Sequence, residues 1–588
     1  MTLSAEQRDY AEGLLRKVHW YAALPEAAQQ SLLAAAEWRG LPGGDVLFYE
    51  GETADAAYLV LSGSLAAYRA GSEGPERIGL SLLGESVGEL GVLTQRPRMA
   101  TVRALRDSEV LRLSAEALEA LGESCPQALL VLSRLALRRL GEPHNPEIRA
   151  SAPRTFALLP QCPGIDLAGF AASLAATLRR YGRVQVLTEA DRGQSVSAYH
   201  TLEKDVRFLF YLADGEDAGW RELCRRQADA WLYLARADEP VSASGELHRR
   251  AEDSALAVPA HLILLHGARF VAGAGSRWQG RCPRAQLHHV REPADIARVG
   301  RLLCGQSLGL VLSGGGARGF AHLGVIKALQ EAGFEIDAVG GTSIGAVIGA
   351  GLAAGWSLEE MQEKFRRCFY DTNPLSDYTL PLIALVAGRK AARLLRETFG
   401  EREIEDLVLP YFCVSANLTE GKVAVHRQGS LWQWLRASIA IPGILPPVFA
   451  GGQVFVDGGV IDNLPVASMR GLHQGEVIAV DIGGDHAVAS MLDEFQLPPL
   501  PRLVVEWFRM RRRPSLAQIL LRAGMVNSAS AAIEARAQSS LLLTPPLDDI
   551  GLLEWNAFFR ASDRGYQYTR RIVGGGADAI ADDVPAML

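Results

Sequence analysis

The chain has 588 residues, too many for a single hydrophobic core, and its 48% hydrophobic and 22% charged residues are typical of a folded protein. Its formal net charge of -7 argues against a dedicated nucleic-acid-binding protein, because such proteins are usually basic. The seven cysteines include no CxxC pair, so we expect neither a disulfide framework nor a metal site, and we expect a reducing, cytoplasmic setting. We find no signal peptide and no apolar run near the roughly 20 residues that span a bilayer.

The first part of the chain, residues 1–145, begins with short helical segments and continues as short strands separated by glycine turns. Strands are expected at residues 45–49, 57–62, 64–69 and 109–113. Gly51 and Gly63 mark turns between them. The proline-containing stretch 141–153 predicts a linker to the next part.

Two neighbouring motifs in this first part suggest a phosphate site. The sequence GELGVL at residues 88–93 is followed by RPRMATV at 96–102. The pair resembles the phosphate-binding cassette of cyclic-nucleotide-binding domains, which implies a β-roll in which Arg98 pairs with the cyclic phosphate and Glu89 with the ribose 2′-hydroxyl. A guanidinium fork suits two phosphate oxygens. Met99 stands where that family usually has a small residue or threonine, so cyclic AMP, cyclic GMP and a β-roll without ligand all stay open.

The middle part, residues 154–300, alternates apolar strands with helical patterns. Strands are expected at residues 155–159, 184–187, 206–212, 230–235 and 261–266, and helices at 167–181 and 219–228. This alternation predicts a parallel α/β sheet of the Rossmann-like kind. Its first turn, LPQCPG at 159–164, lacks a dinucleotide glycine fingerprint, so we expect a structural spacer.

The third part, residues 305–588, contains a candidate nucleophile. GTSIG at residues 341–345 fits the G-x-S-x-G pattern. A short apolar strand at 338–340 precedes it and a helix at 346–354 follows it, which is the setting of a nucleophile elbow. The flanking glycines are expected to permit a strained turn. The pattern therefore predicts Ser343 as the nucleophile.

A glycine-rich loop, SGGGARG at residues 313–319, lies upstream between a strand and a helix. Its amide groups could converge on an acyl-transfer oxyanion or, because Gly314, Gly316 and Gly319 fit GxGxxG, on a dinucleotide pyrophosphate. A dinucleotide fold needs an acidic residue where the next strand ends, but that strand ends in the Ser343 elbow. We therefore favour an oxyanion site.

A serine nucleophile needs a base, and VFVDGG at residues 454–459 offers one. Asp457 ends an apolar strand, where burial should raise its pKa and make it a better base. Three histidines of this part are also candidates for the base, but none has a comparable setting: His322, His426 and His473. A turn-forming Asp-Gly pair is the alternative interpretation of this motif.

The motifs GGGARG, GTSIG and DGG resemble, in order and spacing, those of patatin-like phospholipases. That family uses a Ser–Asp dyad, so the resemblance implies Ser343 as nucleophile and Asp457 as base, with no required cofactor. It also implies an oxyanion loop that includes Gly314, Gly315, Gly316 and Arg318. The blocks RASIAIPG at 436–443 and DNLP at 462–465 resemble the family too. PPLD at 545–548 and DRGY at 563–566 resemble the neuropathy target esterase branch, which implies phospholipid or lysophospholipid substrates.

Two segments are candidates for contact with lipid. YTLPLIALVAG at 378–388 is apolar, and WFRMRRR at 507–513 mixes aromatic and basic residues, a pattern that suits an anionic bilayer surface. A buried helix and a solvated basic face are the alternatives. The predicted protein is a multidomain serine acyl hydrolase with peripheral membrane contact and a cyclic nucleotide as candidate regulator. A non-catalytic cyclic-nucleotide sensor or scaffold is the alternative, and the oligomeric state is left open.

Overall fold

The computed structural model describes residues 3–126, 153–241, 258–483 and 528–574, except positions 17, 23, 72–73, 82–83, 125, 194–195, 381 and 474. The chain divides into two compact units. The first comprises Met1–Ala268 and Trp278–Cys304, and the second comprises Arg269–Arg277 and Gly305–Leu588. None of the helices in the described parts of the chain has the length and hydropathy of a membrane span.

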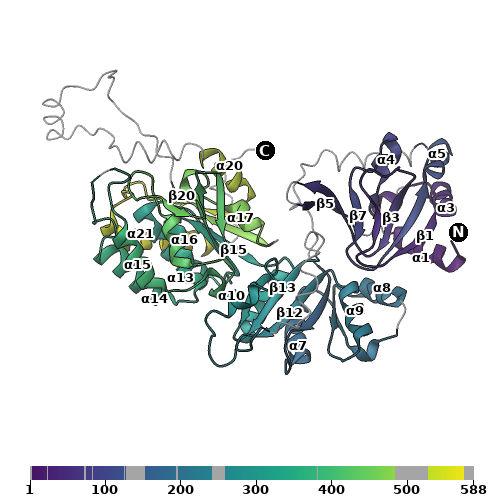
Figure 1. The fold of residues 1–588 in the computed structure, drawn as a ribbon, viewed down its shortest axis with the longest axis horizontal. Coiled ribbons are helices and arrows are strands. Elements are labelled where there is room, and N and C mark those ends of the chain that lie inside the picture. Colours follow the sequence, from purple (N-terminus) through teal and green to yellow (C-terminus); the bar gives the residue numbers. More distant parts are fainter. Residues whose placement is uncertain are drawn as a thin grey trace, which may run out of the picture. The chain divides into compact units, whose positions relative to one another are not determined.

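The first unit begins with a β-roll of two four-stranded antiparallel sheets (Figure 1). One sheet contains, in order, β1 (Glu37–Leu41), β8 (Ser108–Ser114), β3 (Ala56–Ser62) and β6 (Ser86–Val87). The other contains β2 (Val46–Phe48), β7 (Thr101–Ala104), β4 (Leu65–Gly71) and β5 (Gly74–Ser81). The accompanying helices are α1 (Ala5–Leu15), α2 (His19–Ala22), α3 (Glu26–Ala35), α4 (Glu89–Thr94) and α5 (Ala115–Ser124). The predicted β-roll is confirmed.

The same unit contains a six-stranded parallel sheet. Its strands, in order, are β10 (Val184–Leu187), β11 (Phe208–Leu212), β9 (Thr155–Pro160), β12 (Ala230–Arg236), β13 (Ala260–Leu265) and β14 (Gln286–Val290). Its helices are α7 (Leu167–Leu178), α8 (Val196–Asp205), α9 (Ala218–Gln227) and α11 (Pro293–Leu303). β11 is buried at every position, as a strand covered on both faces should be.

The second unit contains an eight-stranded mixed sheet. Its path is β19 (Val448–Ala450), β20 (Gln453–Asp457), β17 (Tyr411–Asn417), β16 (Ala338–Thr342), β15 (Leu308–Leu312), β21 (Glu476–Val480) and β22 (Leu541–Leu543), and β18 (Lys422–His426) pairs with β17. The strands from β17 to β22 run parallel, whereas β18, β19 and β20 are antiparallel additions.

Helices cover both faces of this sheet. The larger core includes residues of α12 (Ala321–Glu331), α13 (Ile344–Ala353), α14 (Leu358–Phe365), α15 (Arg389–Phe399), α16 (Leu431–Ser438) and α21 (Phe558–Gly574). The smaller core includes residues of α17 (Val466–Arg470) and α20 (Ser528–Gln538). Leu310 and Leu312 of β15 belong to the larger core and Val311 to the smaller, as strand alternation requires.

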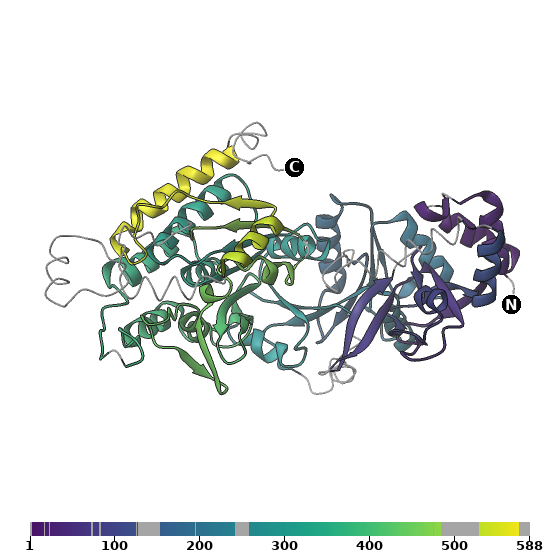
Figure 2. The ribbon, with the colours of Figure 1, turned by 90° about the horizontal axis from the view of Figure 1, so that it is seen from above.

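The C-terminal helix α21 packs against α12 in backbone contact (Figure 2, where α21 is the long yellow helix). A Cβ atom on Gly324 of α12 would lie 1.9 Å from the Ser562 carbonyl oxygen. A Cβ atom on Gly565 of α21 would lie 2.1 Å from the Ala321 carbonyl oxygen. Both glycines are therefore needed for the close approach of the two helices.

Candidate active site

Ser343 lies between the end of β16 and the start of α13, at φ 55° and ψ -126°. Among the described non-glycine residues, only Gln95 and Asn373 also have positive φ. Such a backbone costs about 1–3 kcal/mol and persists only where its surroundings enforce it. The Ser343 amide donates a hydrogen bond to Ser438 Oγ (2.9 Å), and the neighbouring Thr342 Oγ1 donates to the Asp462 carbonyl (3.0 Å). The chain therefore forms a sharp strand–turn–helix bend with the serine at its tip.

The glycines on either side of this bend are required for space. Neither Gly341 nor Gly345 has a positive φ, so the strained conformation falls on Ser343 itself. A Cβ atom on Gly341 would lie 2.6 Å from the Leu312 carbonyl oxygen, and one on Gly345 would lie 2.3 Å from the same atom. The glycines thus permit the strained turn, as expected, because they leave room for it to pack against the end of β15.

Asp457 lies at the end of β20, 114 residues from Ser343 in sequence, and the two side chains are in contact. Ser343 Oγ donates a hydrogen bond to Asp457 Oδ2 at 2.7 Å. The Gly459 amide donates to Asp457 Oδ1 at 2.8 Å. Ser343 and Asp457 are only 7% and 6% exposed. Burial raises the pKa of Asp457 to about 6, although the hydrogen bonds from Ser343 and Gly459 oppose this rise.

The three candidate histidines have other partners. His322 Nε2 lies 2.9 Å from the Ser313 carbonyl oxygen, His426 Nε2 lies 2.6 Å from Ser415 Oγ, and His473 Nδ1 lies 2.9 Å from Ser307 Oγ. Burial lowers the pKa of each histidine to about 4, so all three are neutral at pH 7. Asp457 is thus the titratable side chain that the structure places against the Ser343 hydroxyl.

The glycine-rich loop lies beside this pair. A Cβ atom on Gly314 would lie 3.0 Å from Ser343 Cβ, so the loop passes close to the serine. The Gly314 amide donates to the Asn463 carbonyl (3.3 Å), and Asn463 Nδ2 donates to the Gly314 carbonyl (3.2 Å). Asn463 therefore fixes Gly314 through two hydrogen bonds, and the Gly314 amide already has an acceptor.

The C-terminal segment holds the other end of the loop. Gly316 has φ 56°, and a Cβ atom there would lie 2.1 Å from the Leu552 carbonyl oxygen. The Ala317 amide donates to that same oxygen at 2.8 Å. Arg318 Nε donates to the Ile550 carbonyl at 2.7 Å, so its buried guanidinium anchors this segment. Sequence reasoning missed Ser438, Asn463 and this C-terminal contact, although the blocks RASIAIPG and DNLP contain the first two.

The N-terminal candidates Arg98 and Glu89 are both buried. Arg98 Nη1 donates to the Gly88 carbonyl (3.0 Å) and Nη2 to Asp55 Oδ1 (3.1 Å), and the guanidinium carbon lies 4.1 Å from the Phe48 ring centroid. Met99, in contrast, is 46% exposed. The arginine therefore already has a carboxylate partner where a phosphate was predicted.

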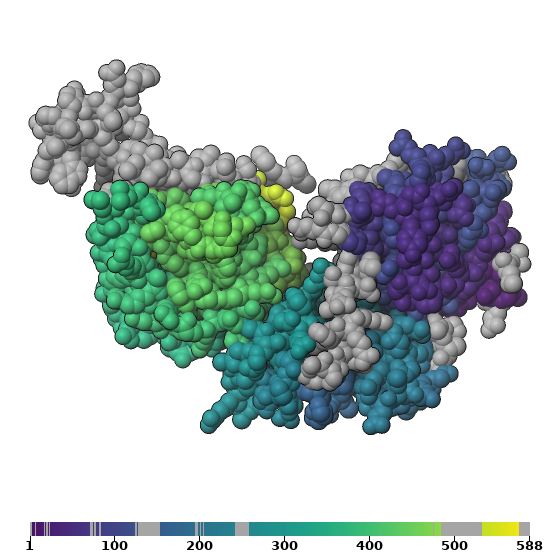
Figure 3. All heavy atoms as spheres, in the orientation of Figure 1, coloured from purple at the N-terminus to yellow at the C-terminus, as the bar shows by residue number. Residues whose placement is uncertain are grey.

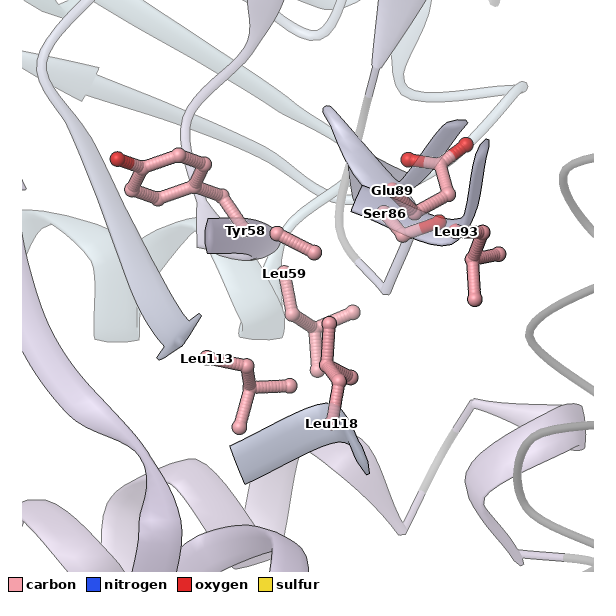
Figure 4. A pocket seen from close by; sticks show the side chains of 8 residues that line it. Tyr58, Leu59, Ser86, Glu89, Leu93, Leu113 and Leu118 are labelled. Atoms are coloured by element: carbon pink, nitrogen blue, oxygen red, sulfur yellow. The ribbon is translucent and has the colours of Figure 1, made fainter. Parts of the chain in front are cut away.

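Glu89 lines a small apolar hollow in the β-roll (Figure 4). The other lining residues are Ala57, Tyr58, Leu59, Ser86, Leu93, Leu113 and Leu118. Figure 4 shows the Glu89 carboxylate pointing away from the leucines. Arg98 is not among the residues that line this hollow, so the two predicted nucleotide contacts do not share it.

Three family models match successive parts of the chain. Residues 38–125 match the cyclic nucleotide-binding domain, residues 153–301 match the Neuropathy Target Esterase family P-loop like domain, and residues 310–470 match the patatin-like phospholipase. An uncharacterized NTE family protein of Mycobacterium tuberculosis is 32% identical over 593 residues, which cover 97% of each chain. The chain belongs to the NTE family.

Longer relatives resemble this NTE family member over part of their length. Patatin-like phospholipase domain-containing protein 6 of Homo sapiens is 30% identical over 96% of this chain and 46% of its own length. Lysophospholipase nte1 of Aspergillus oryzae is 29% identical over 91% of this chain and 41% of its own length. This NTE family member thus spans less than half the length of these two relatives.

Proposed function

We propose that this chain is a serine acyl hydrolase that cleaves carboxylic esters of phospholipids or lysophospholipids with Ser343 as nucleophile and Asp457 as base. The contact of 2.7 Å between Ser343 Oγ and Asp457 Oδ2 carries the proposal. A hydroxyl hydrogen-bonded to a buried carboxylate can lose its proton as it attacks a carbonyl carbon. The relative named as a lysophospholipase and the match to patatin-like phospholipases support the substrate class.

The reaction has two steps. Asp457 takes the Ser343 proton while Oγ attacks the ester carbonyl, and the tetrahedral intermediate then expels the alcohol or lysolipid, which leaves with that proton. Water next gives a proton to Asp457 and attacks the acyl-serine, and collapse releases the fatty acid and restores Ser343. These steps need no metal ion or organic cofactor.

The oxyanion of each tetrahedral intermediate needs hydrogen-bond donors. The Gly314 amide donates to Asn463, so we assign the oxyanion to the amides of Gly315 and Gly316. Arg318 would act through Ile550, by keeping this loop in place. Loss of one such oxyanion donor typically costs about 3–4 kcal/mol in the barrier.

Labelling with a fluorophosphonate probe tests the nucleophile. We expect the unmodified protein to be labelled and the Ser343→Ala variant to lose both labelling and at least about a thousandfold in ester hydrolysis. Ser173→Ala, in the exposed part of α7, is the matched control and should label normally. Labelling that survives in Ser343→Ala would contradict the assignment.

A second proposal concerns the β-roll. The match of residues 38–125 supports binding of cyclic AMP or cyclic GMP as a regulator, with Arg98 and Glu89 as the contacts. Because Arg98 is held by Asp55, a cyclic phosphate would have to share or replace that ion pair. A sensor without catalytic activity remains the alternative function, and loss of probe labelling in Ser343→Ala would exclude it.

A further inference from the structure

The loop at residues 378–385, here called the apolar loop, has an unusual surface. Fifteen large hydrophobic side chains are exposed among the described residues, and five of them lie in this loop: Tyr378, Leu380, Leu382, Ile383 and Leu385. Leu382 is 85% exposed and Tyr378 is 79% exposed. Clustered exposed apolar side chains mark interaction surfaces, whereas scattered ones do not. The alternative that residues 378–388 form a buried helix is wrong, since helix α15 begins only at Arg389.

The backbone of the apolar loop is fixed at its base. Thr379 donates its amide to the Leu385 carbonyl (3.1 Å), and the Ala387 amide donates to the Asp377 carbonyl (2.8 Å). Lys390 Nζ holds the preceding turn through Ser376 Oγ (2.6 Å). The loop therefore exposes its side chains to solvent, while some of its backbone amide and carbonyl groups are hydrogen-bonded to each other. A partner that adds a strand to an open sheet edge is not favoured by this arrangement.

The apolar loop is hydrogen-bonded to the block RASIAIPG at 436–443, which contacts both residues of the candidate active site. Its Leu385 amide donates to the Gly443 carbonyl at 3.0 Å. Three residues earlier in that segment, the Ala440 carbonyl accepts from the Asp457 amide at 2.9 Å. Three residues of chain span at most about 11 Å, so the base of the loop lies near the Ser343–Asp457 pair. Figure 3 shows the green and light-green parts of this unit as one continuous face.

A buried cation stabilises this junction. Arg436, in the block RASIAIPG, donates from Nη2 to the Pro446 carbonyl at 3.0 Å. A Cβ atom on Gly388, just after the loop, would lie 2.7 Å from the same Nη2 atom. The base of the loop is thus packed on the protein while the side chains near its tip face solvent.

We propose that the apolar loop inserts its side chains into the surface of a phospholipid bilayer and brings lipid esters to Ser343. This inference rests on the proposed function, because Ser343 is only 7% exposed and a lipid must leave its aggregate to reach it. Residues 378–388 contain no charged side chain, and the exposed Arg389 follows them directly. An aliphatic tip, with the aromatic Tyr378 and the cation Arg389 at its base, is suited to the boundary between acyl chains and anionic head groups.

Vesicle sedimentation of the full chain tests the loop directly. We compare the double variant Leu382→Ser, Ile383→Ser with the unmodified protein on phosphatidylcholine vesicles with and without phosphatidylglycerol. We expect the lipid concentration for half-binding to rise about tenfold or more, because two apolar side chains no longer enter the acyl region. Ile533→Ser, at a position 69% exposed on α20, is the matched control and should bind as the unmodified protein does.

Two further measurements separate this inference from the proposed function. Hydrolysis of a water-soluble short-chain ester should change less than about twofold in the double variant, since the loop is outside the reacting groups. Ser343→Ala should still sediment with vesicles even though it hydrolyses nothing. Vesicle binding by the double variant equal to that of the unmodified protein would overturn the inference. So would a dimer that dissociates in the double variant, since the loop would then contact a second copy of the chain.

Discussion

Ser343 has both the strained backbone conformation of the candidate site and the hydroxyl proposed to react. Its positive φ aims the hydroxyl at Asp457, and the hydrogen bond from its amide to Ser438 Oγ holds it there. The proposed base, Asp457, is also set by its immediate surroundings, because burial removes its hydration and raises its pKa to about 6. Each of these properties can be tested with single substitutions.

Ser438→Ala should lower kcat with little change in KM. The substitution removes the acceptor of the buried Ser343 amide, which costs about 1–3 kcal/mol and loosens the bend. Steady-state kinetics on a soluble ester measures kcat and KM separately. Ser438→Thr, which retains a hydroxyl, should recover most of kcat. Equal loss in the Ala and Thr variants would show that the hydroxyl does not position Ser343.

The pH dependence of kcat/KM should follow the ionisation of Asp457. Only the carboxylate accepts the Ser343 proton, so the rate should rise with pH through about 6 and then level off. A rate profile on a soluble ester, recorded from pH 4.5 to 8, measures this. A profile that is flat from pH 5 to 7 would contradict the role of Asp457.

Stability should depend on Asp457 in the opposite direction. Because the folded state raises the pKa of this acid from 3.8 to about 6, its protonated form is favoured, and the resulting stability is lost as the pH rises through about 6. Asp457→Asn cannot ionise, so its Tm relative to the unmodified protein should increase between pH 4.5 and 7.5. The pKa of Asp462 is raised to about 6 as well. Because Asp462 is present in both proteins, the difference in Tm between Asp457→Asn and the unmodified protein isolates the contribution of Asp457.

At the scale of elements, the C-terminal part of the chain completes the candidate site. The segment before α21 accepts hydrogen bonds from Ala317 and Arg318 of the glycine-rich loop, and α21 packs on α12, the helix that follows that loop. The motif DRGY contains Gly565, one of the two glycines at which α12 and α21 come into backbone contact. The shape of the glycine-rich loop therefore depends on residues more than 200 positions away in sequence.

Gly565→Ala should destabilise the second unit by about 1–3 kcal/mol, since the added carbon would collide with the Ala321 carbonyl. Gly574→Ala in the same helix is the control, because a Cβ atom there has no neighbour within 4 Å. Urea unfolding of the two variants, monitored by the loss of soluble-ester hydrolysis, gives the midpoints to compare. Equal midpoints for both variants would contradict the tight packing of α12 on α21.

At the scale of the whole molecule, one chain combines a β-roll, a parallel α/β sheet and the mixed sheet that holds the candidate site. The division into domains at 1–145, 154–300 and 305–588 stays a prediction, as does a cytoplasmic location. The segment 507–513, the second candidate for lipid contact, lies outside the described residues. The proposed regulation would require the β-roll to bind a ligand and the proposed ester hydrolysis to change in response.

Arg98→Ala should abolish binding of cyclic AMP and cyclic GMP, because no neutral side chain replaces a guanidinium fork on a phosphate. Calorimetry on the full chain measures binding, and hydrolysis of a soluble ester with and without nucleotide measures regulation. Absence of heat with either nucleotide on the unmodified protein would remove the regulator from the proposal and leave the β-roll as a structural domain.

Sequence motifs and their spacing already indicated the family and the order of the folds. Periodicity placed most strands within a few residues of their observed bounds, because apolar alternation is a local property. It missed β14, whose QLHHV contains two histidines. In the structure His288 and His289 pair with His261 and His266 at 3.0 and 2.7 Å, so polar side chains occupy buried positions without an apolar signal.

The contacts that the predicted site residues make became visible only in the folded chain. In the fold, the Ser343 hydroxyl lies 2.7 Å from Asp457 Oδ2. The Gly314 amide donates to the Asn463 carbonyl, and Arg318 Nε donates to the Ile550 carbonyl. The fold also leaves the apolar loop exposed. Motifs name residue types at short spacing, whereas hydrogen-bond partners and burial depend on segments that meet only when the chain is folded.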